Sequence, residues 1–144
     1  MIEGVRVKKL KPILDERGRL MEIFRVSETD ILPQQVYLTT AYEGVVKDKE
    51  YFHMHKCQTD NLCCIKGKIK LVLVDTREDS KTKGEINEFE IGEDNFCLVT
   101  IPNQVLHAFK SLKDEAFVIN CIDHEYNRES SDELRIKNEY YNWD

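Results

Sequence analysis

The sequence predicts an all-β protein whose strands form a jelly-roll barrel, also called a double-stranded β-helix, with only a few short helical turns. Short runs rich in β-branched and aromatic residues alternate with turn signals, and stretches of helical periodicity are scarce. Many short strands at this spacing are typical of the jelly-roll class of sandwiches and barrels.

Six runs have the pattern of strands, in chain order 36–40, 61–65, 69–74, 85–91, 96–101 and 116–122. Lys66-Gly67 and the polar run 92–95 are predicted to be hairpin turns between successive strands. In the segment 68–73, lysines alternate with isoleucine and leucine, which places one face in the core. A brief helical turn is expected at 27–30 and is limited by Pro33.

One domain is expected, residues 1–144, with the barrel core at about 35–125 and a charged tail at 127–144. The tail contains aromatic residues near its end, namely Tyr140, Tyr141 and Trp143. A short helix that covers the barrel and a frayed terminus are the two alternatives for this segment.

The composition is that of an ordinary globular protein, because 41% of the residues are hydrophobic and 33% are charged. The formal net charge of −6 argues against a nucleic-acid-binding protein, which normally carries a basic face. Neither a signal peptide nor a membrane-spanning segment is recognisable, so we expect a cytoplasmic protein without a membrane partner. The five cysteines form no C-x-x-C pair, which indicates reduced and mostly buried thiols.

The run His53-Met54-His55 is the strongest functional signal in the chain. Side chains alternate between the faces of a strand, so these two imidazoles lie on the same face. Asp60 and Gly67 follow at the spacing of the first half-motif of a cupin, and a later proline-to-histidine run ending at His107 fits the second half-motif. We therefore expect a cupin-type barrel with three histidines and Asp60 in its interior.

Two chemical uses of these side chains are open. In a metal site, His53, His55 and His107 would be nitrogen ligands with Asp60 as a weak fourth, because imidazoles suit first-row metals. In a metal-free pocket, one histidine would be a general base, because its pKa lies near the working pH. Metal cupins generally place glutamate where this chain has the shorter Asp60, so we expect no metal and no cofactor.

A second cluster, the run 15–22, contains a turn at Gly18 with Arg17 and Arg19 on either side. Arginine presents paired donors that match a phosphate group. A turn of this composition is also common as a simple solvated turn. The residues alone leave both interpretations open.

The order and spacing of several motifs resemble those of the dTDP-4-dehydrorhamnose 3,5-epimerase family. The resemblance extends over most of the chain, from about residue 15 to about residue 128. It rests on the turn at Arg17-Gly18 with Glu22, the histidine region, Gly67, Val74-Asp75-Thr76-Arg77, Ser80, Thr82, Gly84 and the run from Ile101-Pro102 to His107-Ala108-Phe109.

Members of this family have jelly-roll barrels, dimerise by exchanging strands, need no metal and act on nucleotide-linked 4-keto-6-deoxy sugars. The resemblance therefore implies a homodimer, a nucleotide-sugar substrate and a role in cell-surface polysaccharide or deoxysugar biosynthesis. It also implies proton abstraction next to the C4 ketone, which acidifies the hydrogens on C3 and C5. A preorganised donor would stabilise the enolate.

Carried over residue by residue, the resemblance makes His53 the base and places His107 in the lumen. Arg17 and Glu22 fall on residues that contact the nucleotide, partly across the dimer interface. The residues that we expect to bind the substrate are Arg17, Glu22, Asp60, Lys70 and His107.

Three family features have no counterpart in this sequence. The run 50–52, Glu-Tyr-Phe, replaces the substrate-binding arginine, the tyrosine acid maps to Ile119, and the late aspartate that partners the base is missing. A substitute proton donor is therefore expected, and the candidates are Tyr37, Tyr126 and a water molecule.

Sugar nucleotide 3,4-ketoisomerases give a second resemblance, because they share this barrel and carry a His-x-His-Lys run like that at 53–56. In that reaction His53 and His55 would move protons between carbon and oxygen through an enediol, with Tyr37 assisting. The catalytic candidates are thus His53, His55, Tyr37 and Tyr126. Two further alternatives are a metal-dependent cupin enzyme and a non-catalytic sugar-binding cupin.

Overall fold

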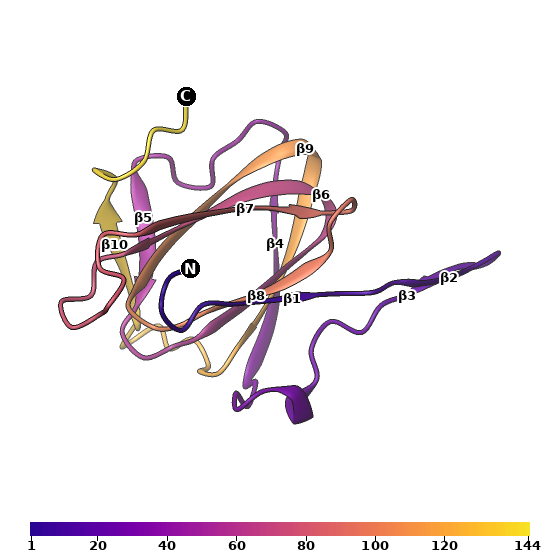
Figure 1. Ribbon diagram of the computed structural model, residues 1–144, viewed down its shortest axis with the longest axis horizontal. Helices are drawn as coiled ribbons and strands as arrows, with labels where there is room; N and C mark the ends of the chain where they lie inside the picture. The colour runs from indigo at the N-terminus through magenta and orange to yellow at the C-terminus, as the bar shows by residue number, and fades with distance from the viewer.

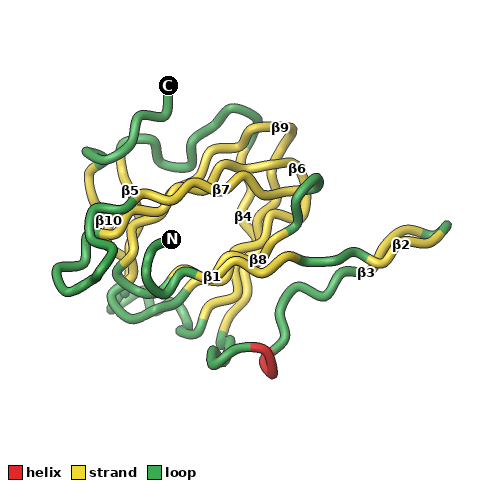
Figure 2. The backbone as a smooth tube through the Cα atoms, viewed as in Figure 1, coloured by secondary structure: helices red, strands yellow, loops and turns green.

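The computed structural model describes residues 1–144, and its strands wrap around a common interior (Figures 1 and 2). One sheet contains eight strands, with the path β1-β8-β6-β9-β5-β10 and with β4 and β7 paired to β9 and β6. The sheet strands are β1 (Arg6–Lys9), β4 (Gln35–Ala41), β5 (Tyr51–His55), β6 (Asp60–Asp75), β7 (Ile86–Gly92), β8 (Cys97–Ile101), β9 (Val105–Ile122) and β10 (Glu133–Lys137). β2 (Ile13–Asp15) and β3 (Gly18–Leu20) form a separate hairpin. The predicted all-β, cupin-type class is confirmed.

The longest strands, β6 and β9, are longer than predicted. The hairpin turn expected at Lys66-Gly67 is wrong, because β6 continues through it with register shifts between Cys64 and Ile69. Gly67 has a φ of +71°, and a Cβ there would lie 2.7 Å from the carbonyl oxygen of Lys113. Glycine at a positive φ serves a β-bulge as well as a turn, so the local sequence could not distinguish the two.

Other local predictions are confirmed. The turn after Gly92 forms, with Asn95 N donating to Gly92 O at 2.9 Å. The brief helical turn is the 3₁₀ helix η1 (Val26–Glu28). Four of the five cysteines are buried, Cys57 is exposed, and all five are free. No helix of the protein is long and apolar enough to cross a membrane.

The charged tail is neither a helix nor a frayed end. It contributes β10, which pairs antiparallel with β5 along its whole length. Beyond β10, Trp143 is only 6% exposed and stacks on Phe52 with ring centroids 6.3 Å apart. The aromatic residues at the end of the chain therefore close a small core with Val72, Val74 and Leu106. This arrangement holds β10 against the strand that carries His53 and His55.

Truncation of Trp143 should destabilise the protein. We expect Trp143→Ala to lower the free energy of unfolding by about 3 kcal/mol, because it leaves a cavity beside Phe52. Tyr42→Ala is the control, since the Tyr42 side chain is 74% exposed and should cost little. Urea unfolding measures both variants, and equal losses would contradict the packing described here.

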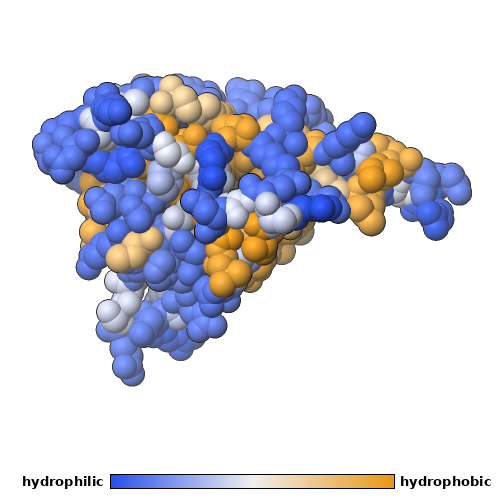
Figure 3. Space-filling view, turned by 60° about the horizontal axis from the view of Figure 1, so that its bottom comes forward, coloured by the Kyte–Doolittle hydropathy of each residue, from blue (hydrophilic) through white to orange (hydrophobic).

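The β2–β3 hairpin projects from the body as an arm (Figure 1). Three apolar side chains on this arm are largely exposed, namely Ile13 at 67%, Leu14 at 69% and Leu20 at 62%. Figure 3 shows hydrophobic surface on the arm and on the adjoining part of the body. Arg19 of β3 contacts the body, with Nη2 3.5 Å from Glu93 Oε1 and its guanidinium group over the Phe96 ring. The exposed apolar side chains of the arm are typical of a segment that packs on another chain.

Candidate active site

Two strands, β5 and β9, bring the three predicted histidines together on the interior face of the sheet. His53 on β5 and His107 on β9 are register partners, with ring centroids 6.5 Å apart. His55 stacks on His107 at a centroid distance of 5.6 Å and an interplanar angle of 20°. The alternation of β5 thus places both of its histidines on the same face, as the sequence predicts.

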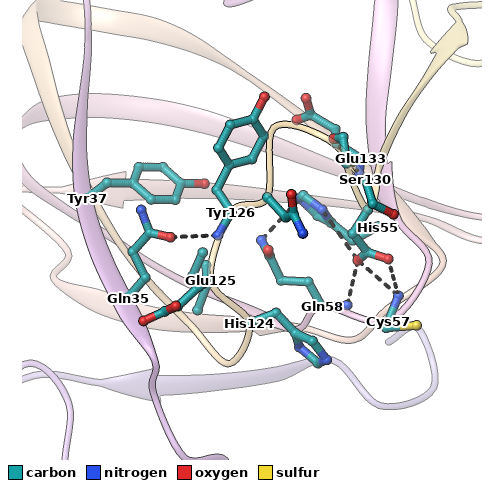
Figure 4. Close-up of a pocket in the computed structure, with 14 residues that line it drawn as sticks. Gln35, Tyr37, His55, Cys57, Gln58, His124, Glu125, Tyr126, Ser130 and Glu133 are labelled. Carbon is teal, nitrogen blue, oxygen red and sulfur yellow. Dashed lines mark hydrogen bonds and ion pairs between the residues drawn. The ribbon is translucent and has the colours of Figure 1, made fainter.

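Two adjoining chambers open beside these rings. The inner chamber has a volume of about 160 Å³ and is lined by His53, His55 and His107 together with Tyr37, Thr39, Lys47, Leu62, Ala108, Phe109, Asn120 and Glu133. The outer chamber has a volume of about 440 Å³ and lies under the segment 122–133, with Tyr126 and Gln58 in its walls (Figure 4). Tyr37, His55 and Glu133 line both chambers and therefore lie at the boundary between them.

His53 is held from both sides by carboxylates. Its Nδ1 lies 2.9 Å from Glu133 Oε1, and its Nε2 lies 3.3 Å from Asp48 Oδ2. Arg135 in turn donates from Nη2 to Asp48 at 2.8 Å. The hydrogen bond to Glu133 raises the pKa of His53 above its ordinary value, against the effect of burial. The same bond lowers the pKa of Glu133.

The partner of His53 was not foreseen from the sequence. The late aspartate expected from the family resemblance is missing from the sequence, and the structure places Glu133 of β10 against His53 Nδ1 at 2.9 Å. Only the pairing of β10 with β5 reveals this, because Glu133 lies 80 residues from His53 along the chain. The assignment of 127–144 to a helix or a frayed end concealed it.

The His53–Glu133 pair makes stability depend on pH with a defined sign. The raised pKa of His53 contributes stability below the unfolded value, and this contribution is lost as pH rises through the folded pKa. The lowered pKa of Glu133 contributes stability that is lost as pH falls through its folded value. The stability lost in Glu133→Gln should therefore be largest between the unfolded pKa values of the two groups, at about pH 5–6.5, and should shrink as pH rises through the raised pKa of His53.

Thermal unfolding across this pH range checks the prediction. Glu125→Gln is the matched control, because it removes the same charge from the outer chamber without touching His53. A stability difference for Glu133→Gln that stayed constant with pH would show that the pair does not titrate as described.

Tyr37 presents a phenol to both chambers. Its hydroxyl accepts a hydrogen bond from Asn120 Nδ2 at 2.8 Å, which leaves its own O–H free to donate into the chamber. Burial, together with the nearby charge of Asp60, raises the pKa of Tyr37 to about 12, so the phenol keeps its proton. Tyr126, the other tyrosine candidate, has a 62% exposed side chain in the outer chamber and does not line the inner one.

Ile119 is not the β9 residue that faces this site. It pairs with Leu38, whereas Asn120 pairs with Tyr37 and lines the inner chamber. Adjacent residues of a strand point to opposite faces, so the Ile119 side chain points away. The mapping of the family's tyrosine acid was therefore one residue out of register, and the polar residue at the site is Asn120.

The expectation that Lys70 binds the substrate needs correction. Lys70 lies on the opposite face of β6, because Leu73 is the register partner of His107 and Lys70 is three residues away. Its Nζ lies 3.8 Å from Glu88 on β7. Lys47, which the sequence analysis missed, is the lysine that lines the inner chamber, and its Nζ donates to Thr40 O at 2.8 Å.

Arg17 and Glu22 lie away from the chambers of their own chain. Arg17 is at the tip of the arm, with an 82% exposed side chain that pairs with Asp15. Glu22 accepts hydrogen bonds from Arg25 at 2.6 and 2.8 Å. Within one chain neither residue can contact a molecule bound beside the histidines.

Asp60 lies behind the chamber wall rather than in it. It is 1% exposed, and neither chamber is lined by it. Gln58 Nε2 and Asn120 Nδ2 donate to its Oδ1 at 2.7 and 3.2 Å. Its Oδ2 lies 3.2 Å from His107 Nε2 and 3.5 Å from His55 Nε2. The expectation that Asp60 binds the substrate is therefore wrong.

The alternative metal site of three histidines does not form, because both ring nitrogens of His53 face carboxylates. The compact group is instead His55, Asp60 and His107, whose donor atoms lie within 4.8 Å of one another. The expectation of a metal-free protein stays a prediction. Elemental analysis of the purified protein tests it, and stoichiometric zinc, iron or manganese would contradict it.

Comparisons with known proteins place these features in a family. The family model described as dTDP-4-dehydrorhamnose 3,5-epimerase matches residues 1–144. A probable low-salt glycan biosynthesis epimerase of Haloferax volcanii is 40% identical over 139 residues, which cover 94% of this chain and 87% of the relative. A spore coat polysaccharide biosynthesis protein of Bacillus subtilis is also 40% identical, covering 94% of this chain and 89% of the relative.

A solved structure agrees with the sequence matches. The crystal structure of dTDP-4-dehydrorhamnose 3,5-epimerase from Sulfolobus tokodaii superimposes with a TM-score of 0.84 at 30% identity. The match covers 98% of this chain and 81% of that one.

Proposed function

This chain belongs to the dTDP-4-dehydrorhamnose 3,5-epimerase family, and we propose that it epimerises a nucleotide-linked 4-keto-6-deoxy sugar for cell-surface polysaccharide or deoxysugar biosynthesis. The names of its relatives in glycan and spore coat polysaccharide biosynthesis support this role. The observation that carries the proposal is the inner chamber. There β5 contributes the imidazole of His53, which is paired with the Glu133 carboxylate, and β4 contributes the protonated phenol of Tyr37.

His53 is the proposed base. The C4 ketone acidifies the hydrogens on C3 and C5, and a neutral imidazole removes one of them as the electron pair moves towards the carbonyl oxygen. Glu133 fixes the ring of His53 through Nδ1. Nε2 is then the nitrogen that takes the proton from the sugar, after its contact with Asp48 has broken. The active form of His53 is the neutral imidazole, whose fraction grows as pH rises. Because the pKa of His53 is raised, this growth occurs at a higher pH than for an ordinary histidine.

Tyr37 is the proposed acid. It comes from β4, whereas His53 comes from β5, so the two groups approach a bound sugar from different walls of the chamber. Reprotonation of the enolate from the face opposite to the base inverts the carbon centre. A volume of about 160 Å³ suits a single sugar ring rather than the whole nucleotide sugar, so the nucleotide extends out of this chamber.

A homodimer is proposed as the working form. Arg17 and the exposed apolar residues Ile13, Leu14 and Leu20 all lie on the projecting arm, which a second copy could cover. In such a dimer, Arg17 of one copy and Lys47 of the other would supply positive charge for the diphosphate. The free, mostly buried cysteines support a cytoplasmic location for this enzyme.

Deuterium exchange tests the proposal. The protein is incubated with dTDP-4-keto-6-deoxyglucose in deuterated water, and the sugar is followed by NMR. Deuterium at C3 or C5 with inversion is expected for an epimerase. Tight binding without exchange would contradict the proposal and favour a non-catalytic sugar-binding protein.

A 3,4-ketoisomerase is the second candidate, and the position of Tyr37 favours it. Tyr37 and His55 both lie at the boundary between the chambers, where they could move a proton between carbon and oxygen of a bound sugar. The same NMR experiment separates the two reactions, because a ketoisomerase forms a new 3-keto sugar and an epimerase retains the 4-keto group.

A further inference from the structure

Asp60 is a buried carboxylate without a lysine or arginine partner. Its ion-pair contacts are with two histidines only, His107 at 3.2 Å and His55 at 3.5 Å. Its other neighbours, Gln58 and Asn120, are neutral amides that donate to Oδ1. Burying an uncompensated carboxylate charge is costly, so a proton on one of these two histidines would stabilise Asp60.

The contacts of the two rings show which histidine holds that proton. His55 Nε2 lies 3.3 Å from the amide nitrogen of Gln58, which is a donor, so this histidine nitrogen accepts. His107 has no donor against either nitrogen. Its Nδ1 lies 3.2 Å from Val105 O, and its Nε2 lies 3.2 Å from Asp60 Oδ2.

A neutral imidazole carries only one N–H. In a neutral His107 beside an ionised Asp60, the other ring nitrogen would therefore direct its lone pair at an acceptor oxygen, either Val105 O or Asp60 Oδ2. Two protons satisfy both contacts, one towards Val105 and one towards Asp60. Burial lowers the pKa of His107, and the negative charge of Asp60 acts against this by favouring the charged ring. The case for two protons therefore rests on the two acceptor oxygens that face the ring.

We propose that Asp60 is a positioning residue that holds the second proton on His107 and thereby aims the positive end of a buried ion pair at the ketone of the bound sugar. His107 lines the inner chamber and Asp60 lies behind it, so the positive charge faces the substrate. This inference rests on the proposed function, in which negative charge develops on the C4 oxygen.

The proton balance of the step is simple. His53 takes the proton from carbon, the C–H electron pair becomes the enolate, and His107 keeps both of its protons throughout. A preoriented charge in a site that excludes water stabilises an oxyanion without reorganisation. Asp60 therefore acts through His107 and does not touch the reacting atoms.

Nitrogen-15 NMR of histidine-labelled protein tests the ion pair directly, without substrate and after treatment with a chelator. Near neutral pH we expect both ring nitrogens of His107 to carry protons, with the signals assigned by their loss in His107→Asn. Asp60→Asn should convert His107 to a neutral tautomer. A His107 that is neutral in the wild type, or unchanged in Asp60→Asn, would overturn the proposal.

Kinetics supply the second readout. Asp60→Asn should lower the deuterium exchange rate at saturating substrate by about 10²–10³-fold, with KM changed by less than about threefold. The double variant Asp60→Asn/His107→Asn should be no slower than the slower single variant, because the two residues act as a unit. A higher KM with an unchanged rate would show instead that Asp60 serves binding.

Asp75→Asn is the matched control. Asp75 is also a buried aspartate on β6, but Arg77, Ser80 and Thr82 hold its carboxylate. This variant should lose stability while the His107 signals and the exchange rate stay the same. If the wild type exchanges no sugar, the proposed function fails while the NMR result stands. If exchange occurs and His107 is neutral, only the present inference fails.

Discussion

His53→Gln is expected to lower the rate of deuterium exchange into the sugar by about 10³-fold, because it removes the group that takes the proton from carbon. Glutamine retains polar atoms near Glu133 and Asp48, so the local hydrogen bonds can persist. Substrate binding should change little, since the loss concerns proton transfer. Exchange followed by NMR, together with titration of the ligand into the variant, measures both quantities.

Cys57→Ser serves as the control for His53→Gln. Cys57 is an exposed free thiol that lines the outer chamber and does not reach the inner one. Its replacement should leave the exchange rate almost unchanged. If the cysteine variant lost activity while His53→Gln retained it, the assignment of the inner chamber as the active site would be wrong.

Tyr37→Phe is expected to separate exchange from inversion. The phenylalanine ring preserves the packing but removes the hydroxyl that faces the chamber and accepts from Asn120. His53 can still remove a proton and return a deuteron to the same face, so exchange should continue. The rate of inversion should fall by about 10²-fold, because the donor on the other wall is absent.

The comparison with Tyr126→Phe makes this result decisive. Tyr126 lines only the outer chamber, so its hydroxyl should not be needed for inversion. Epimer ratios measured by NMR during the reaction give the inversion rate for each variant. Loss of inversion in Tyr126→Phe, with normal behaviour of Tyr37→Phe, would transfer the acid role to Tyr126.

The sequence alone determined the fold class and the face on which the histidines lie. Both follow from the two-residue period of a strand, which places His53 and His55 on one side wherever β5 sits in the sheet. The same local logic identified strand segments within β4, β6, β7, β8 and β9, and the turn after Gly92. It failed at Gly67, because a bulge and a turn use glycine for the same conformational freedom.

Only the tertiary structure decided which residues act with those histidines. Glu133 reaches His53 through the pairing of β10 with β5, and Asn120 rather than Ile119 faces Tyr37 because of the register between β4 and β9. Asp60 lies behind His107 instead of in the chamber. Strand pairing between distant segments sets each of these contacts, and a one-residue change of register moves a side chain to the other face.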